Sequence, residues 1–190
     1  MRRPASGAVL ALLLALQAAP AGAEGAAERL PACLACHGEG GTSAQAGVPS
    51  LGGMPADYVV TQLYLFREKQ RVAEPMNAMA EGLSDDDLRA LGDAVAKLPP
   101  PKPAGEADAA RMAAAQGLVG KHQCNSCHGA DLAGQEQIPR IGAQREDYLL
   151  ATLRAYKSNA RAGYDPAMNE VAQGLSDADI VELAYVIARR

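Results

Sequence analysis

The chain has 190 residues and a formal net charge of −4, with 22 acidic against 18 basic residues. This balance argues against a nucleic-acid binder, which needs a basic face to replace phosphate counterions. An acidic protein is better suited to docking on basic protein surfaces. Four cysteines, three histidines, one phenylalanine and no tryptophan leave few large side chains for a core.

Residues 1–23 have the pattern of an export signal. A basic start is followed by an apolar run over residues 8–16, and the small residues 21–23 fit a cleavage site. The run is about half of the ~20 apolar residues that cross a membrane. We therefore predict cleavage after Ala23 and no membrane anchor. The cleaved part contains two arginines and no acidic residue, so the mature chain has a net charge of −6.

The mature chain is a tandem duplication. CLACHG at 33–38 returns as CNSCHG at 124–129, and VPSLGGMPADYVVTQL and MNAMAEGLSDDDLRAL match IPRIGAQREDYLLATL and MNEVAQGLSDADIVEL. Between the copies, LPPPKPAGEA cannot continue a helix and forms a short, stiff spacer. We predict a first domain at residues 24–98, a proline-rich linker at 99–105 and a second domain at 106–190.

Each copy is predicted to be helical. Val59, Leu63 and Phe66 fall on one face of a helix that begins near Pro55. The matching helix of the second copy covers about residues 145–157. The last helix of each copy follows a Ser-x-x-Asp sequence, in which the serine caps free N–H groups. Because no stretch alternates as a strand does, the predicted class is all-α.

Domains of this size have marginal cores unless a metal, a disulfide or another group supports them. The shortage of large apolar residues therefore predicts a bound apolar prosthetic group. The repeated hexapeptide contains C-x-x-C-H, the attachment signature of c-type haem, in which two thiols add to the vinyl groups and the histidine meets the iron. Cys33 and Cys36 would hold one haem, and Cys124 and Cys127 the other.

Three other readings of the cysteine pairs are less favoured. A compact four-cysteine zinc site needs its pairs closer together than residues 33–36 and 124–127 are. A thioredoxin-like redox pair needs a βαβ setting, which the sequence lacks. A disulfide within each pair suits an oxidising compartment, but does not account for the histidine and glycine that follow both pairs.

Each iron then needs two axial ligands. The histidines of the motifs, His37 and His128, supply one ligand each. His122 lies two residues before Cys124, on the same side of the haem as His128, so it cannot reach the opposite face, and we expect it to be a surface residue. With no other histidine in the chain, methionine is the expected second ligand, as in haem sites of raised reduction potential.

The repeat selects the methionines. Met76 and Met168 occupy matching positions before the last helix of each copy, and we predict that they are the second ligands. Met79 matches Val171, so a packing role is the expected one. Met76 is preferred over Met79 on the repeat alignment alone.

With these motifs in place, the chain resembles the dihaem class I cytochromes c, in particular the cytochrome c4 family. The resemblance covers essentially the whole mature chain: tandem domains with CxxCHG, an IP-x-x-G type loop, a DY-x-x-x-x-L helix and an M-x-x-x-A-x-x-LSD-x-D end. It implies two small helical domains, each wrapped around one covalently bound haem c. It also implies that Pro49 and Pro139 accept a hydrogen bond from the ligand histidine. For Arg71 and Arg161 it suggests contact with haem propionates, although a surface role fits these arginines equally well.

The resemblance implies electron transfer rather than catalysis, because both axial positions of each iron are filled. The expected function is a periplasmic carrier between a respiratory donor and a terminal oxidase or other acceptor. The alternative is an electron-transfer subunit of a periplasmic dehydrogenase, such as flavocytochrome c sulfide dehydrogenase. Partners would be redox proteins, with no nucleic acid and no membrane span. Residues 24–98 have 6 basic and 11 acidic residues, against 9 and 11 in residues 106–190, so we expect a basic partner to prefer the first domain.

Overall fold

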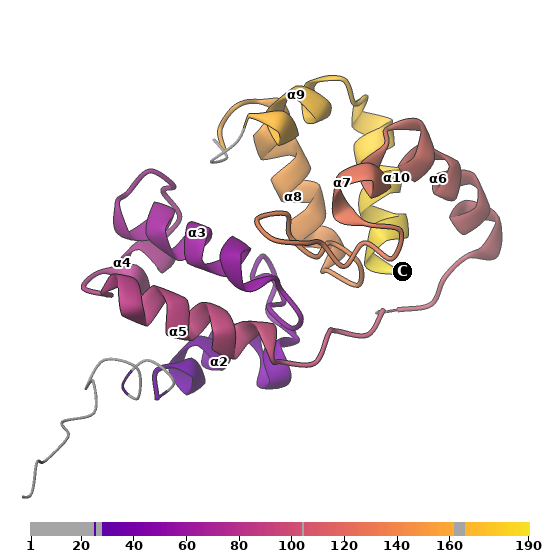
Figure 1. Ribbon diagram of the computed structural model, residues 1–190. Coiled ribbons are helices and arrows are strands. Elements are labelled where there is room, and N and C mark those ends of the chain that lie inside the picture. Colours follow the sequence, from indigo (N-terminus) through magenta and orange to yellow (C-terminus); the bar gives the residue numbers. More distant parts are fainter. Residues whose placement is uncertain (1–24, 26–27, 104, 162–165) are drawn as a thin grey trace, which may run out of the picture.

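The computed structural model describes residue 25 and residues 28–103, 105–161 and 166–190. The predicted export signal, residues 1–23, lies outside the described residues. The described helices form two groups that lie side by side and are joined by an extended segment (Figure 1). The first group contains α2 (Leu30–His37), the short 3-10 helix η1 (Glu39–Gly41), α3 (Ala56–Arg67), α4 (Met76–Ala80) and α5 (Asp85–Ala96). The second contains α6 (Ala109–Lys121), α7 (Cys124–His128), α8 (Glu146–Lys157), α9 (Ala167–Gln173) and α10 (Asp177–Ala188).

The predicted all-α class is confirmed. In the described ranges the only extended pairing is an isolated bridge between Gln135 and Ile138. Helix α3 begins after Pro55 and α8 after Arg145, as the sequence pattern predicts. None of the helices in the described ranges is both long and apolar enough to cross a membrane.

In the first group, α3 packs along α5. The contact joins Phe66 of α3 to Leu88 and Leu91 of α5, residues that recur at helical spacing and are buried. The start of α5 is fixed by the predicted serine cap. Ser84 Oγ accepts a hydrogen bond from the backbone N–H of Asp87 at 3.1 Å, and the Asp87 carboxylate accepts one from the Ser84 N–H at 2.8 Å. This reciprocal capping box satisfies two backbone donors at the helix N-terminus.

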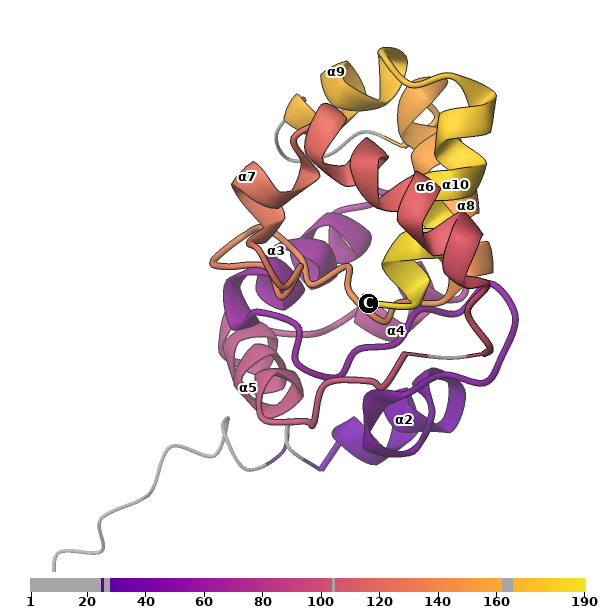
Figure 2. The same cartoon turned by 90° about the vertical axis from the view of Figure 1, so that its right-hand side faces the viewer.

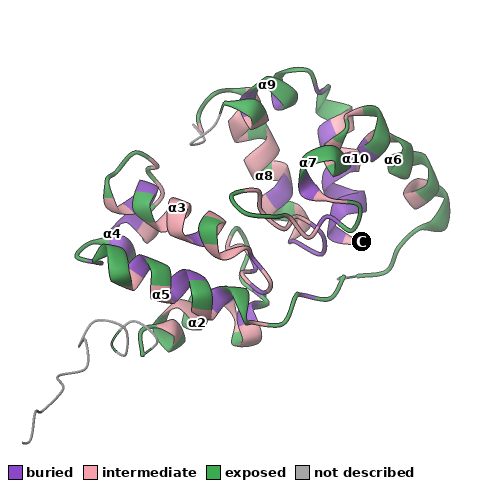
Figure 3. Cartoon of the chain, in the orientation of Figure 1, coloured by how far each residue is buried: buried purple, intermediate pink, exposed green. Residues whose placement is uncertain are grey.

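In the second group, α10 is the central helix. It packs against both α6 and α8, and its residues Ile180, Leu183 and Val186 are fully buried. Figure 3 shows this as a nearly continuous run of buried positions along α10, whereas α6 is mostly exposed. The second group therefore has one large apolar core, while the buried residues of the first group fall into two smaller clusters.

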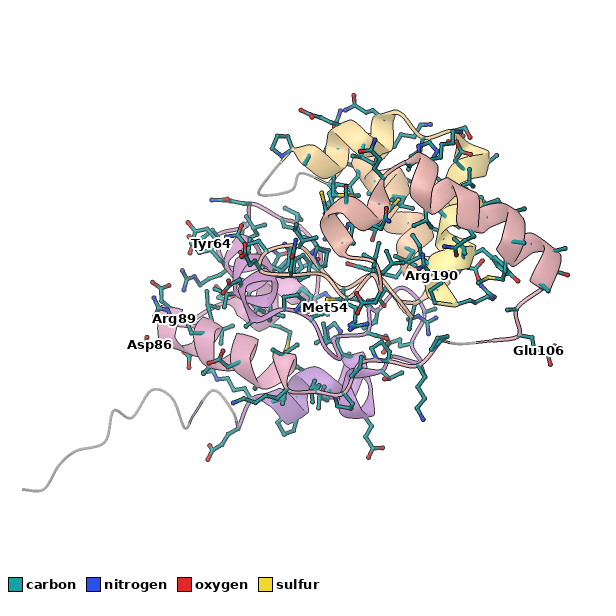
Figure 4. All side chains as sticks on the ribbon, turned by 45° about the vertical axis from the view of Figure 1, so that its right-hand side comes forward. Met54, Tyr64, Asp86, Arg89, Glu106 and Arg190 are labelled. Carbon is teal, nitrogen blue, oxygen red and sulfur yellow. The ribbon has the colours of Figure 1, made fainter. Side chains whose placement is uncertain are left out.

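The two groups meet through the loops that precede α3 and α8. Gln144 donates through Nε2 to the backbone carbonyl of Ser50 at 2.9 Å, and its Oε1 accepts from the Ser50 N–H at 2.8 Å. Arg145 donates to the Ser43 carbonyl at 3.1 Å. Figure 2 shows the loops of the two groups facing one another, and Figure 4 places Met54 where the groups meet. The side chains that make these hydrogen bonds between the groups, Gln144 and Arg145, are polar.

Candidate functional site

The first hexapeptide forms the end of α2 and the turn that follows it. The helix stops at His37 because Gly38 has φ 85° and ψ 156°, a backbone conformation that is open in practice only to glycine. The chain then doubles back so closely that a Cβ atom on Gly38 would lie 1.9 Å from the Thr42 carbonyl oxygen. The turn brings the loop containing Pro49 over the histidine.

His37 is buried and held by one hydrogen bond. Its Nδ1 lies 2.8 Å from the backbone carbonyl oxygen of Pro49. A carbonyl only accepts, so Nδ1 carries the proton and the neutral ring keeps its lone pair on Nε2. Burial lowers the pKa of His37, with a smaller opposite effect from the bond to Pro49, so the ring favours the neutral form that binds metals.

The second hexapeptide repeats this arrangement. Helix α7 ends at His128, which is buried, and Gly129 follows with φ 83° and ψ 162°. The Nδ1 atom of His128 lies 2.8 Å from the carbonyl oxygen of Pro139. Burial again lowers the pKa of the histidine. The two prolines that the resemblance singled out, Pro49 and Pro139, therefore hold the same atom of the two motif histidines.

The four cysteines are free thiols in the structure. Cys36 and Cys127 are exposed, while Cys33 and Cys124 are half-buried and have pKa values raised by burial. Each motif thus presents one outer and one inner thiol beside its histidine. Among the described residues, no group of three or more His, Cys, Asp or Glu side chains lies close enough to hold a metal ion.

These donors fit haem c. Attachment needs two thiols that are free to form thioethers, and iron ligation needs a neutral imidazole whose Nε2 is not hydrogen-bonded. Both motifs supply the free thiols, and no described residue donates to or accepts from Nε2 of either histidine. The chemistry of the donor set therefore matches the group that the sequence predicts.

The structure separates the methionines by environment. Met76 is the first residue of α4 and packs, half-buried, against the apolar cluster around Phe66. Met79 lies three residues further on, with 46% of its surface exposed. Met168 lies near the start of α9 and is half-buried. Met76 thus lies further inward than Met79, and the exposure of Met79 runs against the packing role expected for it.

An asparagine follows each of these methionines, and the sequence analysis did not identify it. Asn77 is buried, and its Nδ2 donates to the carbonyl oxygens of Phe66 and Arg71, both at 2.8 Å, while its Oδ1 accepts from the N–H of Ala73 at 2.7 Å. The amide therefore ties the segment before α4 to the end of α3.

Asn169 has the same place in the second group. Its Nδ2 donates to the carbonyl oxygens of Tyr156 and Arg161 at 3.1 and 2.9 Å. The identical MN pair at 76–77 and 168–169 was the available signal. The bonds themselves depend on a turn that the sequence pattern does not describe.

His122 is not the surface residue that we expected. Only 14% of its side chain is exposed, and its Nε2 lies 3.3 Å from a carboxylate oxygen of Asp179 in α10. The orientation is not that of a hydrogen bond, so Nε2 is buried without a hydrogen-bond partner. His122 packs against α10 because α6 and α10 form a tight pair, a contact that repeat alignment does not show.

Arg71 and Arg161 lie at the interface between the two groups. Both donate to the hydroxyl of Tyr148, at 3.4 and 3.2 Å, and Arg161 also donates to the hydroxyl of Tyr58 at 3.3 Å. A purely surface role is therefore excluded for both arginines. The tyrosines are the Tyr of the DY pair in each copy, which sequence reasoning treated only as a family motif.

Comparisons with known proteins agree with this geometry. The family profile for cytochrome c matches residues 112–187. The chain is 34% identical to a thiosulfate dehydrogenase electron acceptor from Thiomonas intermedia, over 99% of this chain and 91% of that protein. It is 35% identical to a cytochrome c4 from Thiocapsa roseopersicina, over 82% and 85%. The crystal structure of reduced cytochrome c4 from Pseudomonas stutzeri superposes with a TM-score of 0.79 at 26% identity, covering 88% of this chain and 97% of that one.

Proposed function

This chain belongs to the cytochrome c4 family of dihaem class I cytochromes c, and on that basis we propose that it is a periplasmic electron carrier with two haem c groups. It is an electron-transfer protein, as the cytochromes that resemble it over most of its length are. The observation that carries the proposal is the repeated site. Each CxxCH motif pairs free thiols with a buried histidine whose Nδ1 is bound to a proline carbonyl.

We assign the first haem to Cys33, Cys36, His37 and Met76. The second would be held by Cys124, Cys127, His128 and Met168. When bound, each haem supplies an iron that gains and loses one electron. The first domain would occupy residues 24–98 and the second residues 106–190 of a chain exported after cleavage at Ala23.

The chain's own residues orient and shield the bound groups. Pro49 and Pro139 fix the orientation and the tautomer of the ligand histidines, so that Nε2 of each ring faces away from the proline loop with its lone pair available. The buried cluster around Phe66, against which Met76 packs, would keep water from that side of the first site. Ligands held in this way and shielded from water would set the reduction potential of the haem and leave little to rearrange when an electron moves.

Intact mass spectrometry of the protein purified from the periplasm tests the proposal. The mature chain should begin at Glu24 and exceed its apoprotein mass by two haem groups. A Cys124→Ala and Cys127→Ala double variant should retain one haem. A wild-type mass without haem, or with one disulfide in each motif, would exclude the proposed function.

A second candidate is narrower and concerns the electron donor. The relative from Thiomonas intermedia is named an electron acceptor of thiosulfate dehydrogenase. We therefore propose a thiosulfate-oxidising dehydrogenase as a donor, either as a passing partner or in a permanent complex.

Stopped-flow mixing with a purified thiosulfate dehydrogenase decides this point. The haem absorbance should change to the reduced spectrum only when thiosulfate is present, and omission of thiosulfate is the control. Absence of reduction within the enzyme's turnover time would rule out this donor and leave the carrier function intact. Co-elution of the two proteins on gel filtration would identify a permanent complex.

A further inference from the structure

One peptide group joins the histidine of the first motif to a side chain of the second helical group. The carbonyl of Pro49 and the N–H of Ser50 belong to this peptide group. The carbonyl accepts a hydrogen bond from Nδ1 of His37 at 2.8 Å. The N–H donates to Oε1 of Gln144, in the loop before α8, also at 2.8 Å. A contact across the interface thus acts on the same peptide group that holds the histidine.

The amide of Gln144 is fixed on both of its polar atoms. Its Nε2 donates to the carbonyl oxygen of Ser50 at 2.9 Å, and its Oε1 also accepts from the N–H of Arg145 at 3.0 Å. Gln144 and Ser50 are each only 3% exposed. In such a buried place a hydrogen bond is electrostatically stronger than in water, because the local dielectric constant is low. The bond from Ser50 to Gln144 is therefore well placed to influence its neighbours.

A second contact crosses the same interface without involving this peptide group. Arg145 donates through Nη1 to the carbonyl oxygen of Ser43 at 3.1 Å. The N–H of Ser43 in turn donates to Oγ of Ser50 at 3.1 Å, so this contact ends on the side chain of Ser50 and not on its N–H. The interface therefore offers two neighbouring polar residues, of which only Gln144 bonds to the peptide group that holds His37.

The second site has the same histidine bond but no such partner behind it. Nδ1 of His128 lies 2.8 Å from the carbonyl oxygen of Pro139, the same distance as in the first site. The N–H of that peptide group belongs to Arg140, and it has no hydrogen-bond acceptor among the described residues. Met54, the counterpart of Gln144, is buried where the groups meet and has no amide (Figure 4). The two sites thus differ in the partner of the peptide N–H.

Hydrogen bonds that share one peptide group strengthen one another. When the N–H donates, electron density shifts towards the carbonyl oxygen, which becomes a better acceptor. A stronger bond at Nδ1 makes the imidazole a more basic ligand through Nε2. A more basic ligand stabilises oxidised iron over reduced iron, because the oxidised ion has the higher positive charge, and the reduction potential falls.

We infer that Gln144 acts across the interface as a positioning residue for the first haem. By accepting from the N–H of Ser50, it strengthens the bond between His37 and Pro49 and lowers the reduction potential of that haem. The inference rests on the proposed function, since it concerns a bound haem. The second helical group thereby takes part in setting the potential of the first site.

Redox titration of the haem-loaded Gln144→Met variant tests this role. The haem methyl proton resonances report each haem separately. Methionine is the residue of the other copy and offers no oxygen to the N–H of Ser50. At a fixed ambient potential, the ratio of reduced to oxidised haem should rise about two- to threefold in the first domain and stay unchanged in the second. A purely structural role gives the opposite sign, because water admitted by a loosened interface stabilises the oxidised haem.

Arg145→Lys is the matched control. It keeps the positive charge but removes the planar guanidinium that reaches the carbonyl of Ser43, so it weakens the same interface without touching the peptide group between Pro49 and Ser50. The ratio of reduced to oxidised haem should stay at the wild-type value in both domains. Far-UV circular dichroism and haem content must match the wild type for each variant compared.

Proton NMR of the reduced protein measures the histidine bond itself. In the wild type, the Nδ1 proton of His37 should lie downfield of that of His128, because its acceptor is more polarised. Gln144→Met should move the His37 proton towards the position of the His128 proton and leave the latter in place. Gln144→Glu keeps an oxygen acceptor for the N–H of Ser50, and should keep the wild-type position of the His37 proton.

The inference is overturned if Gln144→Met lowers the ratio of reduced to oxidised haem in the first domain or leaves it unchanged. An unshifted Nδ1 proton of His37 in this variant overturns it as well. If the variant does not fold, the wild type decides, and equal positions of the two histidine protons overturn the inference. A wild-type protein without two haems would refute the proposed function, whereas two haems that are both indifferent to Gln144 would refute this inference alone.

Discussion

At the scale of single residues, one hydrogen bond fixes the tautomer of each motif histidine and leaves its Nε2 lone pair free, as the predicted role of iron ligand requires. The bond from Nδ1 to a proline carbonyl excludes the tautomer that would block Nε2, and burial disfavours the charged ring. The two proline carbonyls therefore determine the direction of the ring and its tautomer, while burial keeps the ring neutral. The methionines differ, because their place depends on packing and on the asparagine that follows them.

The assignment of Met76 as an iron ligand can be tested by the absorption band of the thioether–iron bond. Met76→Ala and Met168→Ala should each remove the thioether-to-iron charge-transfer absorbance of one haem and lower the potential of that haem. Met79→Ala should leave both bands intact, because 46% of the surface of Met79 is exposed. If Met79→Ala loses a band and Met76→Ala retains both, then Met79 and not Met76 is the iron ligand of the first haem.

Asn77 is expected to hold the Met76 segment in place. Asn77→Ala removes three hydrogen bonds and takes the side-chain partner from the half-buried Ala73 N–H and Arg71 carbonyl, so we expect a loss of about 2–3 kcal/mol of unfolding free energy. Guanidinium denaturation measures the loss, and the charge-transfer band should weaken at temperatures where the protein is still folded. Gln116→Ala, at an exposed position of α6, is the control and should change neither quantity. An unchanged band in Asn77→Ala would limit the asparagine to a stabilising role.

At the scale of elements, α2 and α7 are short helices whose ends decide where the histidines point. Both end at a glycine in a backbone region that other residues avoid. The two turns are not equally tight. A Cβ atom on Gly38 would overlap the Thr42 carbonyl, whereas on Gly129 the nearest atom is a carboxylate oxygen of Asp131 at 3.3 Å.

This difference predicts unequal costs for the same substitution. Gly129→Ala should cost about 1–3 kcal/mol from backbone strain alone. Gly38→Ala should cost more, since the turn must open to remove the overlap, and should reduce haem incorporation in the first domain. Measurements of haem content and of chemical denaturation for the two variants test whether Gly38→Ala costs more than Gly129→Ala. Equal effects would mean that the turn after α2 opens easily.

At the scale of the whole molecule, the two groups are joined through polar contacts between loops. The amide of Gln144 makes two hydrogen bonds to the backbone of Ser50, and all four atoms involved belong to buried residues. The first copy has Met54 at the matching position, which has no amide to make the equivalent hydrogen bonds.

Replacing Gln144 by methionine, the residue of the other copy, should weaken the interface. The N–H and the carbonyl of Ser50 lose their partners, and we expect a loss of about 1–3 kcal/mol per unsatisfied buried group. Differential scanning calorimetry should then show two transitions where the wild type shows one. A single transition at an unchanged temperature would show that other contacts suffice to join the groups.

The greater acidity of the first domain predicts where a basic partner docks. Glu68 and Glu146 are engaged in ion pairs with Arg67 and Arg189, so reversing them would also disturb packing. Exposed carboxylates near the predicted methionine ligands are better positions for charge reversals that test docking.

We expect Glu81→Lys, next to α4, to slow association with a basic redox protein severalfold at low salt, and less at high salt. Glu170→Lys, at the corresponding side of the second domain, should have a smaller effect. Stopped-flow rates over a range of ionic strengths provide the comparison. Equal slowing by both substitutions, or association rates that do not change with salt concentration, would contradict the predicted preference of a basic partner for the first domain.

The sequence alone determined the helical class, the duplication, the haem motifs and the start of α3, α5 and α8. Those features depend on local chemistry: thiol and imidazole spacing, apolar periodicity, and a serine cap whose partner is three residues away. The repeat also pointed to Met76, because two copies of one fold place equivalent residues alike.

Only the tertiary structure decided how residues far apart in the sequence meet. It buried His122 against α10, gave Asn77 its three backbone partners, and brought Arg71 and Arg161 to one tyrosine at the interface. Repeat alignment compares each residue with its counterpart in the other copy, and not with the surface on which the other copy packs. Contacts between the copies depend on how two folded groups fit together, and therefore have no local signature in the sequence.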